Sequence, residues 1–200
     1  SNPKICKYID LPIQHISDNV LRRMRREHSG EETRRLLNDI RRMVPGAAVR
    51  TTVIAGHPGE TEEDFSELLR FLEEYRFERL GAFGYSHEEK THAWLSYTDD
   101  LSAREKERRV ARVMELQQRI SGEINASRKG EVVRVIIDRK EGLFHVGRSQ
   151  HDSPEVDQEV LVVTDKRIKP GTFINVKITG SSEFDLYSVE TGSIGGSANR

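Results

Sequence analysis

The spacing of apolar residues divides the chain into two parts with different periods. Through about residue 125, short apolar runs typical of strands alternate with apolar residues at helical spacing. The predicted strands are Lys7–Ile13, Ala47–Ile54 and Leu80–Tyr85. From Gly130 onward the period changes to two, as in strands with one buried face. The pattern therefore predicts an α/β region followed by an all-β region.

Helix starts in the first part are marked by capping residues. Ser17 and Thr61 are typical N-cap residues, and Ser29 begins a capping box. A long charged helix is predicted from Ser102, after a loop that begins at Ser86. The residues expected to face the core are Val20, Leu21, Met24, Leu36, Leu37, Ile40, Met43, Phe65, Leu68, Leu69, Leu72, Tyr75, Val110, Val113, Met114, Gln117, Ile120 and Ile124.

Five short strands are predicted in the second part, which indicates a small β-barrel. They contain Val133 to Ile137, Phe144 to Val146, Val160 to Thr164, Phe173 to Thr179 and Phe184 to Val189. We therefore expect an α/β domain over residues 1–127, a barrel over residues 128–190, and a flexible tail over residues 191–200.

The composition is that of a soluble globular protein. Of 200 residues, 35% are hydrophobic and 32% are charged, and the net charge is −1. The apolar runs are too short to span a bilayer and the N-terminus lacks a signal-peptide pattern, so we expect a cytoplasmic protein without a membrane partner. The single cysteine, Cys6, supplies neither a disulfide nor a metal or iron-sulfur site, and we interpret it as a small buried residue.

Polar and small residues follow the predicted parallel strands. Gln14 and His15 follow the first strand, Gly56 follows the second, and Tyr85 and Ser86 end the third. Ligands of α/β proteins bind at the carboxyl ends of such strands. Either ligand binding or the closing of a loop explains Gln14 and His15 equally well. For His57, exposure to solvent is favoured over stacking on a ligand.

Three blocks of sequence resemble the radical S-adenosylmethionine methylthiotransferases. The first two are Tyr8-Ile-Asp-Leu-Pro-Ile-Gln-His-Ile-Ser17 and Arg50-Thr-Thr-Val-Ile-Ala-Gly-His-Pro-Gly-Glu-Thr-Glu-Glu-Asp-Phe65, with Tyr85-Ser86 and Glu88-Glu89 after them. The third, Gly142-Leu-Phe-His-Val-Gly-Arg-Ser149 with Asp152 to Asp157, is similar to the TRAM barrel that ends these proteins. One departure is Lys90, which stands where the family usually has glycine.

The resemblance implies the carboxyl-terminal half of a partial (β/α) radical SAM barrel, holding its fourth to sixth strands, followed by a TRAM domain. It also implies S-adenosylmethionine and two four-iron four-sulfur clusters, whose cysteine motifs are absent from this chain. We therefore expect a truncated piece that is inactive alone, and the catalytic residues stay unknown. In the family, reductive cleavage of S-adenosylmethionine yields a deoxyadenosyl radical that takes hydrogen from an unactivated carbon.

Carried over residue by residue, the family's cofactor site falls on Gln14, His15, Arg50, Ile54, Gly56, Tyr85 and Ser86. Gln14 and His15 would hold the methionyl or ribose part. Arg50 would pair with the methionine carboxylate, and its alternative role is a structural salt bridge. Gly56 would let the backbone approach the adenine closely.

Charge favours a protein substrate over RNA. Residues 131–200 carry nine Lys and Arg against eleven Asp and Glu, whereas an RNA-binding barrel would be basic. Acidic residues that suit a basic ribosomal protein are Asp152, Glu155, Asp157 and Glu159. The basic run Arg22 to Arg26 and the charged side of the long helix are interpreted as solvated surfaces.

The family contains two kinds of acceptor, which leaves alternatives open. The branch that this chain resembles most modifies the β-carbon of an aspartate in a small-subunit ribosomal protein. The alternatives are a transfer-RNA adenosine methylthiotransferase, and a module without clusters that only binds the ribosome.

Overall fold

A computed structural model describes residues 4–191, which form two compact units. One unit spans residues 7–120, and the other spans residues 121–191 together with residues 4–6. The division falls within one long helix. The expected domain boundary after residue 127 stays a prediction, and residues 192–200 of the expected flexible tail lie outside the described residues.

The first unit contains a three-stranded parallel sheet in the order β1-β2-β3. Its strands are β1 Tyr8–Asp10, β2 Ala48–Ala55 and β3 Arg79–Gly84. The first strand is shorter than predicted and ends two residues before Pro12, which cannot donate a ladder hydrogen bond. The chain rejoins the sheet at Gln14, which forms an isolated bridge to Val53.

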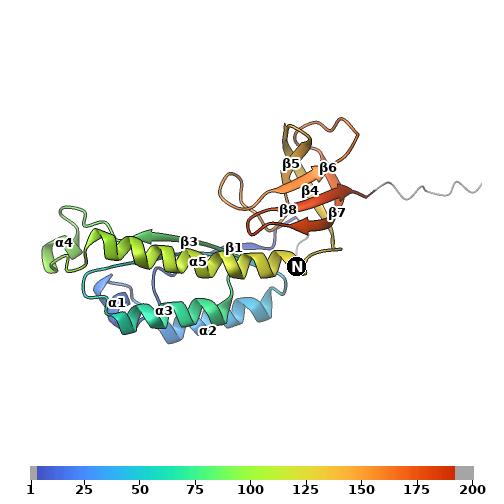
Figure 1. Cartoon of the computed structure of the whole chain (residues 1–200). Coiled ribbons are helices and arrows are strands. Elements are labelled where there is room, and N and C mark those ends of the chain that lie inside the picture. Colours follow the sequence, from blue (N-terminus) through green and yellow to red (C-terminus); the bar gives the residue numbers. More distant parts are fainter. Residues whose placement is uncertain (1–3, 192–200) are drawn as a thin grey trace, which may run out of the picture. The chain divides into compact units, whose positions relative to one another are not determined.

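Five helices belong wholly or partly to this unit. They are α1 Asp18–Arg23, α2 Gly30–Met43, α3 Glu62–Tyr75, α4 His92–Ser96 and α5 Ala103–Ser127. Helices α2 and α3 lie together on one side of the sheet (Figure 1). The predicted caps are confirmed: Ser29 forms a capping box with Glu32, and Thr61 forms one with Asp64. The short helix α4 interrupts a segment that the sequence predicted as loop.

The core of the first unit lies between one face of the sheet and the helices. Val49 and Val53 of β2 are fully buried against Leu37, Phe65 and other helix residues. Two residues of the predicted core are exposed, since Leu36 is 48% and Met43 is 64% accessible. Phe71, which the predicted stripe omitted, is fully buried.

Along β2, residues that enter this core alternate with residues whose side chains lie on the other face of the sheet. Arg50, Thr52 and Ile54 occupy the intermediate positions of β2 between buried neighbours. Because side chains of a strand alternate between two faces, these three residues lie on the face opposite the core. The strand register places Arg50 beside Asp10 and Ile54 beside Phe83. Phe83 is 61% exposed, so this face is partly apolar and accessible.

The second unit contains a closed barrel of five strands, in the order β4-β5-β6-β8-β7. The strands are β4 Val132–Glu141, β5 Phe144–Arg148, β6 Val160–Val163, β7 Phe173–Ser181 and β8 Leu186–Glu190. Alternate residues such as Val135, Ile137 and Val176 fill its core. The predicted fold class, an α/β region followed by a small β-barrel, is confirmed.

Adjacent leucines of α2 provide a direct test of this packing. Leu37→Ala should lower the free energy of unfolding of the first unit by about 2–5 kcal/mol, because Leu37 is fully buried. Leu36→Ala is the matched control and should cost less than about 1 kcal/mol. Urea unfolding of both variants measures the difference, and equal losses would contradict the placement of α2.

Candidate functional site

The carboxyl ends of the three strands surround a pocket of about 300 Å³. Four sequence-predicted residues line it: Gln14, Ile54, Tyr85 and Ser86. Gln14 is tied to the sheet by its backbone, since its N–H donates to Thr52 O at 2.9 Å and its carbonyl accepts from Ile54 N at 2.8 Å. The Tyr85 N–H donates to Ala55 O at 2.9 Å. Main-chain hydrogen bonds to β2 therefore fix the segments that follow β1 and β3.

His15 is fully buried and does not line this pocket. Its Nδ1 accepts a hydrogen bond from Ser17 N at 3.0 Å. Its Nε2 lies 3.8 Å from Glu60 Oε2 and has no hydrogen-bond partner within residues 4–191. Burial lowers the pKa of His15 to about 4, so the ring is neutral at neutral pH.

Glu60 is a buried carboxylate that sequence analysis did not identify. Its Oε2 accepts from Gly56 N at 2.7 Å and from His57 N at 3.3 Å. Its Oε1 lies 2.6 Å from Nη1 of Arg109, whose side chain is 5% exposed. Burial raises the pKa of Glu60, and the Arg109 guanidinium and the Gly56 and His57 N–H groups act in the opposite direction. The carboxylate holds the loop after β2 against α5.

Gly56 itself has φ +83°, a conformation that favours glycine. A Cβ placed there would lie 2.5 Å from Cγ of Lys106. Both Lys106 and Arg109 are buried, so the prediction that the charged side of the long helix is solvated is wrong at these two positions. Lys106 Nζ lies 2.6 Å from Oδ2 of Asp99 in the loop before α5, and Arg109 pairs with Glu60.

His57 lines the pocket, and the prediction that it faces solvent is wrong because only 3% of it is exposed. Its ring packs edge-on against Tyr85, with ring centroids 4.9 Å apart. Burial lowers the pKa of His57. The wall of the pocket is therefore aromatic and neutral at this side.

Arg50 lies away from the pocket, on the open face of the sheet. Its Nε is 3.7 Å from Asp10 Oδ2, and its side chain is 17% exposed. Arg50 precedes Ala55 by five residues, a distance of about 16 Å along the strand. The structure therefore separates Arg50 from Gln14, Ile54, Tyr85 and Ser86, and its role in cofactor binding stays a prediction.

Lys90 stands where the family usually has glycine, and its backbone conformation corresponds to this. Lys90 adopts φ +66°, the left-handed conformation that glycine favours. The loop therefore keeps the backbone conformation that glycine would permit.

Cys6, which was interpreted as buried, is exposed.

The acidic residues of the barrel loop are in different environments. Asp152 is buried and accepts from Ser149 N at 3.2 Å and from Ser149 Oγ at 2.6 Å. Asp157 accepts from Ser153 N at 2.8 Å. Glu159 pairs with Arg139 at 2.7 Å, while Glu155 is exposed. Three of the four thus take part in local structure, and docking of a partner by this group stays a prediction.

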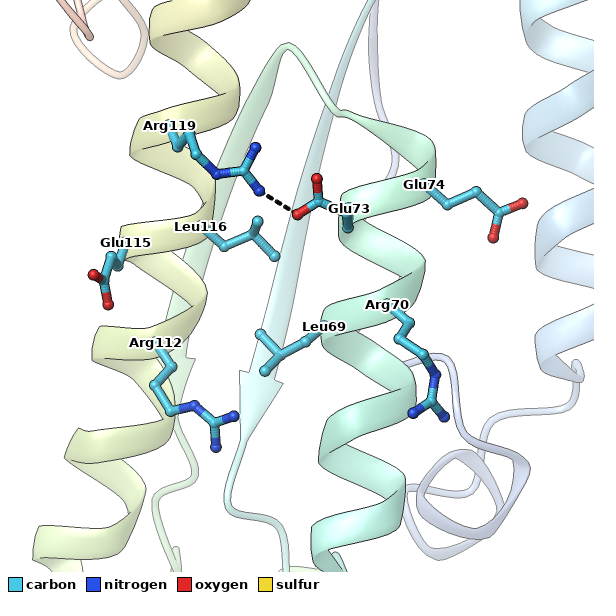
Figure 2. A pocket seen from close by; sticks show the side chains of 8 residues that line it. All are labelled: Leu69, Arg70, Glu73, Glu74, Arg112, Glu115, Leu116 and Arg119. Atoms are coloured by element: carbon cyan, nitrogen blue, oxygen red, sulfur yellow. Dashed lines mark hydrogen bonds and ion pairs between the residues drawn. The ribbon is translucent and has the colours of Figure 1, made fainter.

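A larger open groove of about 710 Å³ lies between α3 and α5. Figure 2 shows Leu69 and Leu116 pointing toward one another between the helices, with charged side chains around them and an ion pair between Glu73 and Arg119. The charged side chains that complete its lining are Arg70, Glu74, Arg112 and Glu115. No sequence-predicted site residue lines this groove.

Neither a metal site nor a membrane span is found in the described part of the chain. Within residues 4–191, no group of three or more His, Cys, Asp and Glu side chains is placed to hold a metal ion. No described helix is both long enough and apolar enough to cross a membrane.

Two family models match separate parts of the chain. The Radical SAM superfamily matches residues 2–72, and the TRAM domain matches residues 130–189. In solved structures, Escherichia coli coproporphyrinogen III oxidase (HemN), described as a radical SAM enzyme, matches 57% of this chain and 27% of its own, with a TM-score of 0.50 and 23% identity. This last likeness concerns the fold alone.

Curated relatives are considerably more similar. The ribosomal protein uS12 methylthiotransferase RimO of Flavobacterium johnsoniae is 53% identical over 186 residues, covering 92% of this chain and 42% of that protein. The RimO of Parabacteroides distasonis is 51% identical over 183 residues, with the same coverage. The chain therefore spans about two fifths of the length of these relatives.

The buried His15 predicts a loss of stability in acid. Its pKa is lower in the folded chain, about 4, than in the unfolded chain, about 6.5, so the unfolded state binds the proton first as pH falls. Stability should be lost between these two values, by about 2 kcal/mol at pH 5.

His15→Asn tests this, because the Asn oxygen can accept from Ser17 N without titrating. Urea unfolding at pH 7 and pH 5 should show a flatter pH dependence than in the parent chain. His28→Asn, on the exposed turn before α2, is the matched control and should keep the parental profile. An unchanged profile in His15→Asn would contradict the assignment.

Proposed function

We propose that this chain is part of a radical S-adenosylmethionine methylthiotransferase, an enzyme that adds a methylthio group to the β-carbon of an aspartate in a small-subunit ribosomal protein. The observation that carries this proposal is identity of 50% or more, over 92% of the chain, with proteins named for modification of ribosomal protein uS12. The pocket at the strand ends supports it, because a ligand of this sheet is expected there.

We propose that S-adenosylmethionine binds across the strand ends. The pocket offers an amide from Gln14, the apolar side chain of Ile54, and hydroxyls from Tyr85 and Ser86. These groups fit a ligand with an adenine ring and several hydrogen-bonding atoms. Gly56 does not line the pocket: Lys106 fills the space beside its Cα, and its N–H donates to Glu60. When bound with its cluster, this cofactor supplies the radical chemistry of the family.

His15 and Arg50 do not line the pocket, and we propose that they contribute to binding from outside it. The buried Nε2 of His15 has no partner within the described chain, so a small movement would let it donate to Glu60 or to a ligand atom. Arg50 would offer its guanidinium to the methionine carboxylate from the open face of the sheet. Because Arg50 also faces Asp10, binding would exchange one carboxylate for another.

Among residues 4–191, the His, Cys, Asp and Glu side chains form no group of three or more that is placed to hold a metal ion. We therefore propose that both four-iron four-sulfur clusters are held by another part of the full-length enzyme, and that residues 1–200 alone are inactive. The acidic barrel residues, Glu155 above all, would contribute to docking of a basic ribosomal protein in the cytoplasm.

Mass spectrometry of ribosomal proteins tests the proposed function. The small-subunit proteins and the anticodon-loop nucleosides are compared between cells with and without the gene. We expect a methylthio adduct to disappear from the aspartate-bearing protein alone. Loss from a transfer-RNA adenosine instead would assign the protein to the RNA-modifying branch, and no change in either would favour a module that only binds the ribosome.

A further inference from the structure

A cluster of arginines borders the pocket at the strand ends. Arg23, Arg25 and Arg26, from the end of α1 and the turn after it, all line the pocket. Sequence analysis interpreted this basic run as a solvated surface, which the exposure of Arg22, Arg25 and Arg26 bears out. Arg25 and Arg26 are exposed, yet they contribute to the rim of the pocket.

The backbone of this turn is fixed by hydrogen bonds. The Arg25 N–H donates to Arg22 O at 3.0 Å, and the Arg26 N–H donates to Leu21 O at 2.9 Å. This is the Schellman pattern, in which the residue after the cap takes a left-handed conformation and is usually glycine. Arg25 occupies that position with φ +57°. An arginine therefore stands where the local fold alone would favour glycine.

Arg25 and Arg26 have no ion-pair partner in the part of the chain that the structure describes. Other arginines of the unit pair with carboxylates, as Arg41 does with Glu78 at 2.6 Å. Arg23 is held differently, with its guanidinium 4.9 Å from the centre of the Tyr97 ring. Two cationic groups at the rim are thus available to a ligand.

The rest of the pocket adds little opposing charge. Glu88 is the one acidic residue among those that line it, and its Oε1 accepts from Ser86 Oγ at 2.6 Å. Guanidinium groups bind carboxylates through paired hydrogen bonds. The pocket therefore suits a ligand that presents a carboxylate from the solvent side.

We propose that Arg25 and Arg26 bind the side-chain carboxylate of the acceptor aspartate and so determine specificity for an acidic acceptor. This inference rests on the proposed function and extends it to the recognition of the substrate. The exposed position of both residues favours a carboxylate on an incoming protein chain. The methionine carboxylate of S-adenosylmethionine could bind the same guanidinium groups. The experiment must therefore distinguish this carboxylate from that of the aspartate.

The test measures binding to the full-length protein with S-adenosylmethionine bound. Two peptides of the acceptor loop are compared, one with the aspartate and one with asparagine in its place. The parent protein should bind the aspartate peptide at least about tenfold more tightly, as expected for a charge-assisted pair. In Arg26→Gln this preference should fall below about threefold, with the affinity for the asparagine peptide unchanged.

Arg25→Gly supplies a second, independent readout. It should lose the preference for aspartate while its urea unfolding midpoint stays equal to that of the parent or rises, because glycine is favoured at φ +57°. Arg22→Gln is the matched control, since Arg22 belongs to the same run but does not line the pocket. It should keep the full preference.

Other results would overturn the proposal. If Arg26→Gln lowers the affinity for S-adenosylmethionine and keeps the peptide preference, the carboxylate belongs to the cofactor. If the parent does not distinguish the peptides, or if the arginine variants lose affinity only for an anticodon stem-loop RNA, no aspartate subsite exists here. The peptide preference is measured without turnover, so its failure is distinguishable from absence of the methylthio product in cells.

Discussion

The buried carboxylate of Glu60 fixes the loop on which the candidate site depends. Glu60 Oε2 accepts from Gly56 N and His57 N, and Oε1 pairs with Arg109 of α5. Removing one partner of such a pair would leave a charge buried without compensation, which is strongly unfavourable. The pair therefore couples the end of β2 to a helix that begins more than forty residues later, and it sets where the Gly56 backbone and the His57 ring stand.

The buried and the accessible parts of the site differ in character. His15 and Glu60 are enclosed, and their pKa values are shifted by burial. The pocket has an aromatic, neutral wall at His57 and Tyr85 and a cationic rim at Arg25 and Arg26. A rigid base with an accessible, charged border is suited to holding a cofactor while a second, larger substrate approaches.

Local patterns predicted most of the fold because they report local physics. The capping box at Ser29, the helix start at Thr61 and the period-two strands of the barrel appear where expected. The helix α4 was missed because its five residues carry no periodic stripe, and none of them is buried. Burial of Arg109 was missed because its partner, Glu60, is 49 residues away in the sequence.

The candidate site was predictable only in part. Gln14, Ile54, Tyr85 and Ser86 were identified by position at strand ends and by the family resemblance, and the structure brings them to one pocket. The arginine rim was not identified, because a basic run on a short amphipathic helix is usually solvated. One signal in the sequence was not used: no glycine follows α1. Arg25 instead takes the left-handed conformation that usually favours glycine at this position.

The most direct test of this account is a crystal structure of the full-length protein with S-adenosylmethionine bound. The account predicts the adenosyl group at the carboxyl ends of β2 and β3, in contact with Ile54 and Tyr85, with the Glu60–Arg109 pair intact. A cofactor bound elsewhere, such as in the groove between α3 and α5, would contradict it.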